Sequence, residues 1–300
     1  MEEIKKEDID GWKTTLRSAF VSGITGTSVE KMKACIDVGY YYMCYAPTSL
    51  YKYYSDHPRN FEAVKNNKMW YSAPCNFNDV FDCTLTIEEK DIFDSALRMV
   101  PDNRGIRQGS VMWKQVKGTV GQSIRTFQSS FEDLRSRMGI SCLSETDDSL
   151  LMWAHYANNH SGICVEYELL EFNSQLHFSP VPIVYTDERV CIHTLETLAN
   201  DIQGLFIESL TSKSPEWSYE REWRIIRDDG ACGAKWDTIN KGALLDAPHP
   251  KSITMGCMVK PDYEEEVRKY CEENGVNLYK MEKSRKKYRL QKKTIFEFDD

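Results

Sequence analysis

The chain has 300 residues, of which 41% are hydrophobic and 12% aromatic, and its formal net charge is -8 with a sequence pI of about 5.4. This composition is typical of a folded globular protein and excludes a disordered or low-complexity chain. A chain of this length forms one large domain or two smaller ones. The acidic balance argues against capture of nucleic acid by the whole surface, but it leaves room for a local basic patch.

Ten cysteines are scattered along the chain, and no Cys-x-x-Cys pair is among them. They are interpreted as buried free thiols and not as a disulfide framework. The N-terminus is charged and lacks the apolar core of a signal peptide, and no apolar run approaches the ~18 residues of a membrane span. We therefore expect a cytoplasmic protein, whose thiols stay reduced, without a membrane partner.

The N-terminal part is predicted to be a helical extension over residues 1–48. Thr27 and Glu30 form a capping box, which opens a short helix that Gly39 is expected to end. The aromatic residues 40–45 that follow are interpreted as a strand or a partner surface, with burial in the core favoured.

Short strands are predicted next, over residues 50–54 and 68–75, before a loop at residues 76–79. Residues 86–137 are predicted to be helical with an interruption at 101–109. In their last part, apolar side chains recur at the spacing of a helix that faces the core, and these side chains are Ile124, Phe127, Phe131 and Leu134.

The rest of the chain is predicted to be mainly β. A buried strand over residues 139–144 precedes a helix that Asp147 or Asp148 caps and that ends near Asn158. Further strands are expected at 162–167, 181–186, 220–227, 252–259 and 278–283, and helices at 194–211 and 261–273, the latter with proline in its first turn. Residues 49–300 are therefore expected to form a single α+β domain with a mixed or split β-sheet core and flanking helices.

One segment near the C-terminus is strongly basic. Eight basic residues and a single acid, Glu282, lie between Lys280 and Lys293. Two interpretations are open: a solvated strand edge that lysines protect from aggregation, and a groove for nucleic acid. The strand edge is favoured.

The strand expected near residue 222 carries an unusual charge pattern. Successive side chains alternate in an extended chain, so Glu220, Glu222 and Arg224 are expected to share one face, while Trp223 and Ile225 enter the core from the other. A face with three charges is expected to be solvent or a cleft. A structural ion pair and a catalytic carboxylate have about equal weight here.

Two other clusters combine aromatic and titratable side chains. Asn78 and Asp79 lie in a predicted turn, where short polar side chains form hydrogen bonds with the local backbone. On the predicted helix, a single face is expected to carry Met152, His155, Tyr156 and Asn159. A histidine on such a face is more often a core residue than a catalyst. The step from His155 to His160 matches no common zinc spacing, so no metal is expected.

Common catalytic motifs are absent from the sequence. It contains no Gly-x-x-x-x-Gly-Lys-[Ser/Thr] loop, no Gly-x-Ser-x-Gly elbow and no Gly-x-Gly-x-x-Gly after a strand. The remaining candidate is a site of aromatic and amide groups beside a carboxylate. Such a site suits a planar ring and a positive charge that develops as a bond to that ring breaks.

Several motifs in a fixed order make the chain similar to the domain-of-unknown-function family 2971. In chain order they are Leu50-Tyr-Lys-Tyr, Trp70-Tyr-Ser-Ala-Pro, Phe77-Asn-Asp79, Phe81-Asp-Cys83, Leu151-Met-Trp-Ala-His-Tyr-Ala157, His160-Ser-Gly-Ile-Cys164 and Trp217-Ser-Tyr-Glu-Arg-Glu-Trp-Arg224. The resemblance spans residues 50 to about 260. Val80 stands where the family usually has proline, which affects only the loop conformation.

A weaker resemblance is to the ADP-ribosyltransferase fold, in which NAD lies between split sheets and a late-strand glutamate stabilises the oxocarbenium-like ribose. It rests on an early strand with Tyr51-Lys52-Tyr53, a middle aromatic segment and a late strand with Glu222. Lys52 stands where this fold has arginine or histidine on its first strand.

The second resemblance implies roles for particular residues. Glu222 is expected to orient the ribose hydroxyl or activate the acceptor. Tyr51, Trp153 or Tyr156 are expected to stack on nicotinamide or adenine, and His155 and Arg224 to hold the ribose and a phosphate. The expected catalytic residues are Glu222, His155 and Glu220, and the expected NAD-binding residues are Tyr51, Lys52, Asn78, Asp79, Trp153, Tyr156, His160 and Arg224.

The function expected on these grounds is that of an NAD-dependent ADP-ribosyltransferase or NAD glycohydrolase, in the setting of a toxin or a phage-defence effector. Its partners are then a nucleotide and a protein or nucleic-acid acceptor. Two alternatives stay open: a non-enzymatic module that binds a nucleotide or a protein, and a nuclease or nucleic-acid binder that uses the basic C-terminal segment.

Overall fold

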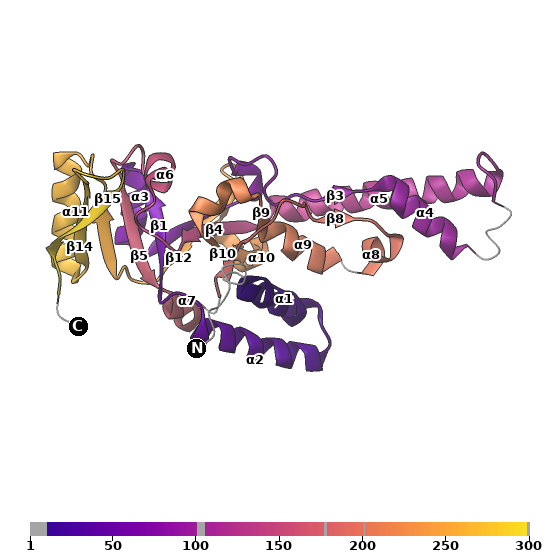
Figure 1. The fold of residues 1–300 in the computed structure, drawn as a ribbon, viewed down its shortest axis with the longest axis horizontal. Helices are drawn as coiled ribbons and strands as arrows, with labels where there is room; N and C mark the ends of the chain where they lie inside the picture. The colour runs from indigo at the N-terminus through magenta and orange to yellow at the C-terminus, as the bar shows by residue number, and fades with distance from the viewer. Residues whose placement is uncertain (1–10, 101–105, 177–178, 201, 299–300) are drawn as a thin grey trace. The chain divides into compact units, whose positions relative to one another are not determined.

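The computed structural model describes residues 11–100, 106–176, 179–200 and 202–298 (Figure 1). The chain divides into two compact units, each built from three separate segments. The first unit comprises residues 1–41, 74–137 and 184–215, and the second comprises residues 42–73, 138–183 and 216–300. The expected division into a helical extension over residues 1–48 and a single domain over residues 49–300 stays a prediction.

The first unit is mostly helical. Its helices are α1 (Gly11–Thr25), α2 (Ser28–Cys44, of which residues 42–44 belong to the second unit), the 3-10 helix Pro74–Asn76, α4 (Glu89–Met99), α5 (Val111–Ser136), α8 (Leu195–Asn200) and α9 (Ile202–Leu210). Its strands form two short parallel pairs, β3 (Thr86–Ile87) with β8 (Cys191–Ile192) and β7 (Val184–Tyr185) with β9 (Ser212–Lys213).

Helix α2 begins as the sequence predicts. The Thr27 backbone N–H donates to Glu30 Oε2 over 2.7 Å, and the Glu30 N–H donates to Thr27 Oγ1 over 3.4 Å, which completes the capping box. The predicted end at Gly39 is wrong, because the helix continues to Cys44. A glycine inside a helix costs only about 1 kcal/mol relative to alanine, so it does not end one by itself. The aromatic run after it is therefore largely helical, and Tyr42 is its buried member.

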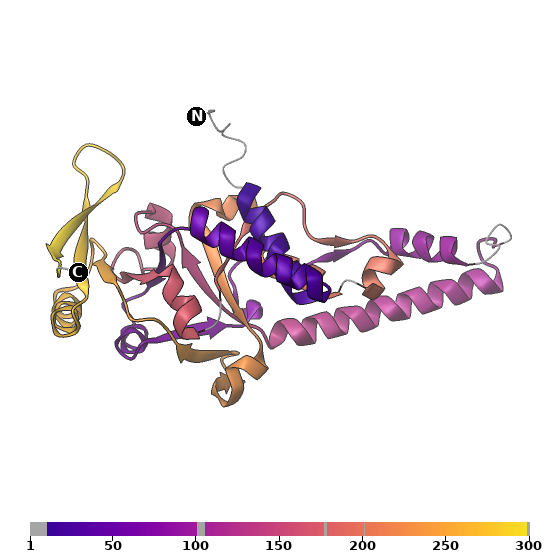
Figure 2. The same ribbon diagram turned by 90° about the horizontal axis from the view of Figure 1, so that it is seen from below.

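Helix α5 has the apolar face that the sequence predicts. Ile124, Phe127 and Phe131 are buried, and the ring of Phe131 lies 5.4 Å from that of Phe206 on α9. The helix begins at Val111, after an N-cap in which Ser110 accepts a hydrogen bond from a backbone N–H. Figure 2 shows α4 running alongside this long helix.

The second unit is built on a mixed sheet, which has eleven strands within the described residues. The strands are β1 (Ser49–Tyr54), β2 (Lys68–Ser72), β4 (Gly139–Ser144), β5 (Ile163–Glu168), β6 (Val181–Pro182), β10 (Glu222–Arg227), β11 (Trp236–Asp237), β12 (Gly242–Asp246), β13 (Ser252–Met255), β14 (Asn277–Lys283) and β15 (Leu290–Phe296). The helices are α3 (Pro58–Lys65), α6 (Leu150–His155), α7 (Leu169–Leu176), α10 (Asp229–Cys232), α11 (Pro261–Asn274) and the 3-10 helices Pro215–Glu220 and Gly233–Lys235. The expected α+β class with a mixed sheet is confirmed.

The order of strands along the sheet is β11-β12-β2-β4-β1-β5-β13-β14-β15, and β10 joins it through β4 and β6. Among these strands, β13 and β14 pair in parallel and are connected through α11, which lies beside β14 in Figure 1. The other pairs are antiparallel.

Strand β4 is the branch point of this sheet. It pairs with β10 along its whole length, from Gly139 to Ser144. A strand has two edges, so its other partners lie on the opposite edge, where β2 meets it only at Ile140 and β1 only at Ser144. Strands β1 and β2 therefore diverge from the middle of β4, which opens a gap in the hydrogen-bond ladder there.

Some predicted boundaries differ from those of the structure. The helix expected to end near Asn158 ends at His155, because Asn158, Asn159 and His160 have positive φ angles. Its N-cap is Ser149, which accepts a hydrogen bond from a backbone N–H, and not Asp147 or Asp148.

Several predicted strands are shorter in the structure. The strand expected from residue 68 ends at Ser72, before the 3-10 helix that begins at Pro74, and the one expected from residue 252 ends at Met255. The segment expected as one strand over residues 181–186 is divided between β6 and β7 of different units. The helix expected over residues 194–211 comprises α8 and α9, with residue 201 outside the described ranges.

Six cysteines differ from the expected burial, and of these Cys142, Cys191 and Cys257 are half-buried. All ten are free, but Cys35, Cys44 and Cys75 are exposed. In the described ranges, no helix is both long enough and apolar enough to cross a membrane.

Candidate functional site

Strand β10 alternates as expected, but both of its faces are covered. Glu222 and Arg224 share one face, and Trp223 and Ile225 share the other. All four side chains are buried, with Glu222 3% and Arg224 0% exposed. The expectation that the charged face is solvent or a cleft is therefore wrong. Glu220 does not lie on this strand at all, because the preceding residues form a 3-10 helix.

Glu222 and Arg224 form a buried, bidentate ion pair. Arg224 Nε donates to Glu222 Oε1 over 2.7 Å, and its Nη2 donates to Glu222 Oε2 over 3.1 Å. Two parallel bonds of this kind hold both planar groups in a fixed geometry. Burial and this pairing keep the guanidinium on the carboxylate, so it is not placed to hold a phosphate.

Lys52 on β1 occupies the gap where β1 leaves β4. Its Nζ donates to Ser141 Oγ and to the Cys142 carbonyl oxygen, each over 2.9 Å. Burial lowers the pKa of Lys52, although Cys142 and Glu222 act in the opposite direction. Burial likewise raises the pKa of the Cys142 thiol well above 9.0, and the Glu222 carboxylate adds to this shift. Lys52 therefore supplies hydrogen bonds to polar groups of β4 at the gap in the sheet.

A second carboxylate, Glu220, is surrounded by rings. The Tyr156 hydroxyl donates to Glu220 Oε1 over 2.5 Å. The ring of His155 lies 6.4 Å from Tyr156 and 6.3 Å from Tyr219, and the ring of Tyr219 lies 6.1 Å from Trp217. Glu220 is 3% exposed, the three other aromatic rings are partly exposed and His155 is exposed. We refer to these five residues as the Glu220 cluster.

The backbone around Glu220 is held from both sides. The 3-10 helix Pro215–Glu220 ends at this residue, and Ser144 Oγ donates to the Glu220 carbonyl oxygen over 2.6 Å. Arg221 then has a φ of 45°, a left-handed conformation that is costly for a residue with a Cβ atom. The Glu145 N–H holds this turn by donating to the Arg221 carbonyl oxygen over 3.1 Å. The turn separates Glu220 from β10 and brings its side chain to Tyr156.

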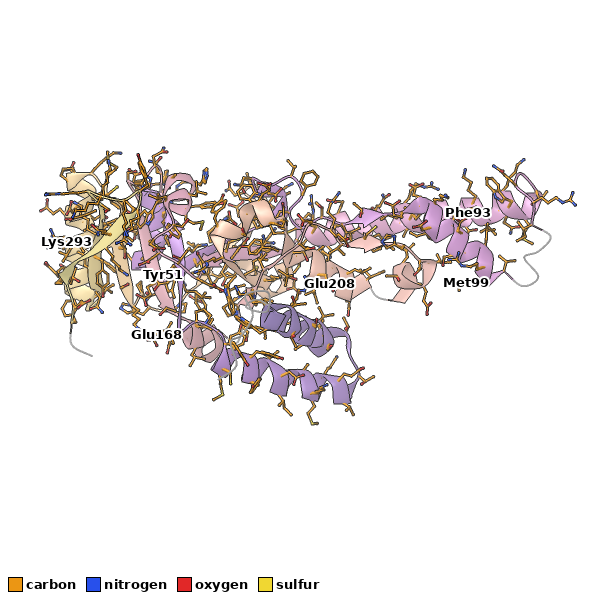
Figure 3. The ribbon with its side chains drawn as sticks, viewed as in Figure 1. Tyr51, Phe93, Met99, Glu168, Glu208 and Lys293 are labelled. Atoms are coloured by element: carbon orange, nitrogen blue, oxygen red, sulfur yellow. The ribbon has the colours of Figure 1, made fainter. Side chains whose placement is uncertain are left out.

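Two aromatic residues expected to stack on a ligand have different environments. Trp153 is 0% exposed, and its Nε1 donates to the Asp147 carbonyl oxygen over 2.6 Å. Its ring belongs to the core and offers no stacking surface. Tyr51 lies on β1 (Figure 3) and is partly exposed, with Lys292 Nζ 6.0 Å from the centre of its ring. Burial, and next the Glu166 carboxylate, raise the pKa of Tyr51.

His160 follows α6 in a left-handed turn with a φ of 69°. Its Nδ1 is buried and has no hydrogen-bond partner in the described part of the chain. Burial lowers the pKa of this imidazole, and the nearby cation Lys283 lowers it further. The face expected to carry Met152, His155, Tyr156 and Asn159 is not complete, because α6 ends at His155, so Tyr156 is its C-cap and Asn159 lies beyond it.

Asn78 and Asp79 belong to the first unit, so they are described separately from the Glu220 cluster. Asp79 Oδ1 accepts a hydrogen bond from the Phe81 N–H over 2.9 Å, which confirms the predicted Asx turn. Asp79 also lines a pocket of about 250 Å³ with Arg189 and Lys213.

Lys213 is buried and forms an ion pair of 3.6 Å with Asp82, which is also buried. No sequence pattern points to this pair, because the two residues are far apart in the chain; Asp82 lies in the Phe81-Asp-Cys83 motif, but Lys213 lies in none. The described residues contain no group of three or more His, Cys, Asp or Glu side chains placed to hold a metal ion.

Comparison with known proteins gives one family. Residues 152–225 match the family model described as "Protein of unknown function (DUF2971)". The expected resemblance to that family is confirmed over this segment, which contains the whole Glu220 cluster. No match was found among curated proteins or among solved structures. The weaker resemblance to the ADP-ribosyltransferase fold stays a prediction.

Proposed function

We propose that this chain, whose residues 152–225 match the DUF2971 family model, cleaves the N-glycosidic bond of NAD at the Glu220 cluster, as an ADP-ribosyltransferase or an NAD glycohydrolase. The supporting observation is a carboxylate that is 3% exposed and bonded to Tyr156, beside partly exposed aromatic rings. A toxin or phage-defence effector is the biological setting we propose, since loss of NAD harms the cell in which it occurs.

The chemistry of the cluster fits this bond. The bond between C1′ of the ribose and the nicotinamide nitrogen breaks, and its electron pair goes to that nitrogen, which neutralises the ring. The ribose is left with positive charge, which a carboxylate in surroundings of low dielectric stabilises strongly. Water captures the sugar in a glycohydrolase, and a nucleophile of the acceptor captures it in a transferase.

The cluster gives each residue a separate role. Glu220 supplies the negative charge, and Tyr156 holds its carboxylate in place. Tyr219 and Trp217 offer partly exposed faces for the nicotinamide ring. His155, the exposed member, is placed to accept the proton of the incoming nucleophile. The buried Glu222–Arg224 pair then stabilises β10 and does not contact the substrate.

The test is release of nicotinamide from NAD by purified protein, with and without cell lysate as a source of acceptor. Glu220→Gln keeps a hydrogen-bond acceptor for Tyr156 but removes the charge, so it is expected to lower the rate at least about 100-fold with little change in melting temperature. Glu265→Gln, which neutralises an exposed glutamate on α11, is the matched control.

The outcomes separate the possibilities. Release that needs Glu220 and lysate indicates a transferase, and release that needs Glu220 alone indicates a glycohydrolase. Glu222→Gln is expected to lower the melting temperature, because it leaves Arg224 buried with a weaker partner. Equal rates for the wild type and Glu220→Gln, or no release in either condition, would contradict the proposal.

A non-enzymatic binding module is the second candidate. It is favoured by the engagement of Arg224 with Glu222 and of Lys52 with Ser141 and Cys142, because both cations expected near the phosphates already have protein partners. Calorimetric binding of a nucleotide without nicotinamide release, weakened by Tyr219→Ala, would support this candidate.

A further inference from the structure

The hairpin of β14 and β15 ends in a basic loop. Residues Leu278 to Lys283 of β14 pair with β15, and residues 284–289 connect the two strands. Figure 2 shows this loop extending past the paired strands. Five cations lie at this tip: Lys283, Arg285, Lys286, Lys287 and Arg289.

The lysines of the stem differ from those of the tip. Lys280 pairs with Glu264 over 2.7 Å, and Lys292 pairs with Asp147 over 2.6 Å. Lys293 pairs with Glu282 over 3.0 Å. Within the described residues, the five cations of the tip form no ion pair. Protection of a sheet edge explains lysines on β15, which is the last strand of the sheet, but it does not explain charges concentrated in the connecting loop.

An aromatic side chain lies among these cations. Tyr288 is fully exposed. The loop is held by Ser284 Oγ, which accepts hydrogen bonds from the Lys286 and Lys287 N–H groups over 3.4 and 3.3 Å. An exposed ring without packing partners contributes nothing to the core, but its faces are open to a flat ligand.

We propose that this tip binds single-stranded nucleic acid, with Tyr288 stacked on a base and the surrounding cations on the phosphates. Stacking on an aromatic ring combined with cations along the backbone is the usual mode of binding single strands. The tip has no aliphatic side chain to enter a lipid bilayer, so an anionic membrane is disfavoured. Because the whole chain has a net charge of -8, a polyanion is expected to be attracted only to a local basic patch such as this tip.

The experiment measures fluorescence anisotropy of a labelled single-stranded oligonucleotide of about 20 nucleotides with the full chain. Affinity is expected to fall as salt rises, with a slope of about -0.7 in log affinity against log salt for each phosphate contacted. Tyr288→Ala is expected to weaken binding roughly ten-fold, because a stacked base contributes about 1–3 kcal/mol.

Charge reversal at the tip has a matched control. Lys286→Glu with Lys287→Glu is expected to reduce binding more than Tyr288→Ala does. Lys31→Glu with Lys33→Glu makes the same change in net charge at exposed positions of α2 and is expected to retain binding.

Three results would overturn the proposal. They are an equal loss in the α2 control, no effect of Tyr288→Ala, and binding of phosphatidylserine vesicles without binding of the oligonucleotide. The nicotinamide assay without lysate contains no nucleic acid, so failure here does not bear on the NAD proposal.

Discussion

At the level of individual residues, the Glu222–Arg224 pair is expected to affect the stability of the second unit strongly. Two opposite charges lie in the interior and satisfy each other through two hydrogen bonds. Removing charges from water costs several kcal/mol, and the pairing offsets this cost only while both partners are present. The pair therefore matters most through what happens when one partner is lost.

We expect Arg224→Met to lower the free energy of unfolding by about 3–5 kcal/mol, because it removes the guanidinium that pairs with the buried Glu222 carboxylate. Urea unfolding followed by circular dichroism measures this change. Glu222→Gln with Arg224→Met is expected to cost less than the single change, since neither member of the pair then carries a charge. The exposed pair provides the control: Lys293→Met is expected to cost about 0–1 kcal/mol. Similar losses of unfolding free energy for Arg224→Met and Lys293→Met would contradict the claim that burial makes the first pair more important.

Glu220 shows how far residue identity can mislead. In the sequence it shares the alternation of Glu222 and Arg224, and the pattern places it on the same strand. The left-handed turn at Arg221 removes it from that strand and gives it Tyr156 as a partner. Its identity as a candidate was predictable, but its environment was not.

At the scale of elements, the turn after β13 depends on a close approach of two backbones. A Cβ atom at Gly256 would lie 2.1 Å from the His160 carbonyl oxygen, which accepts a hydrogen bond from the Met258 N–H. Only a residue without a side chain fits between these segments. This contact fixes the turn that carries His160 after α6.

We expect Gly256→Ala to destabilise the protein by about 1–3 kcal/mol, because a backbone atom has to move. Gly118→Ala on α5 is the control, since a Cβ atom there meets nothing within 4 Å. That change is expected to be neutral or to stabilise by about 0.5–1 kcal/mol through higher helix propensity. Thermal unfolding of both variants compares them, and a loss of the same size in each would contradict the steric explanation.

Helix ends and strand ends show the limits of local signals. The capping box at Thr27 sets where α2 begins, because both of its hydrogen bonds lie within four residues. The end of α2 was not predictable from Gly39, since packing of the following turn at Tyr42 outweighs the weak cost of glycine. Likewise, the positive φ angles after α6 follow from contacts with other segments.

At the scale of the whole molecule, each unit is assembled from three chain segments that alternate along the sequence. The segment matched by the DUF2971 model contributes to both units, yet all five residues of the Glu220 cluster lie in the second. The basic hairpin lies outside the matched segment. A function common to the family is therefore more reasonably sought at the Glu220 cluster than at the hairpin.

The cysteines give a prediction for the whole chain. We expect Cys35, Cys44 and Cys75 to react rapidly with a thiol reagent under native conditions, because they are exposed. Buried thiols such as Cys271, whose pKa burial raises to about 12, are expected to react only after unfolding. Mass spectrometry of native and urea-unfolded samples identifies the labelled sites. Rapid native labelling of Cys164 or Cys271 would contradict the described core.

Features that depend on neighbouring residues were predictable from the sequence alone. These include the capping box, the apolar face of α5 and the alternation of Trp223 and Ile225 into the core, because backbone periodicity fixes which side chains share a face. The α+β class also followed from the order of such elements. The motif order further indicated the family that the comparison confirms for residues 152–225.

Contacts between residues far apart in the chain became known only from the folded structure. It joined Tyr156 to Glu220, placed Lys52 in the gap beside β4 and buried the Glu222–Arg224 pair. It also paired the stem lysines while leaving the tip of the hairpin charged and exposed. These outcomes depend on chain segments far apart in sequence, whose packing and desolvation no local pattern encodes.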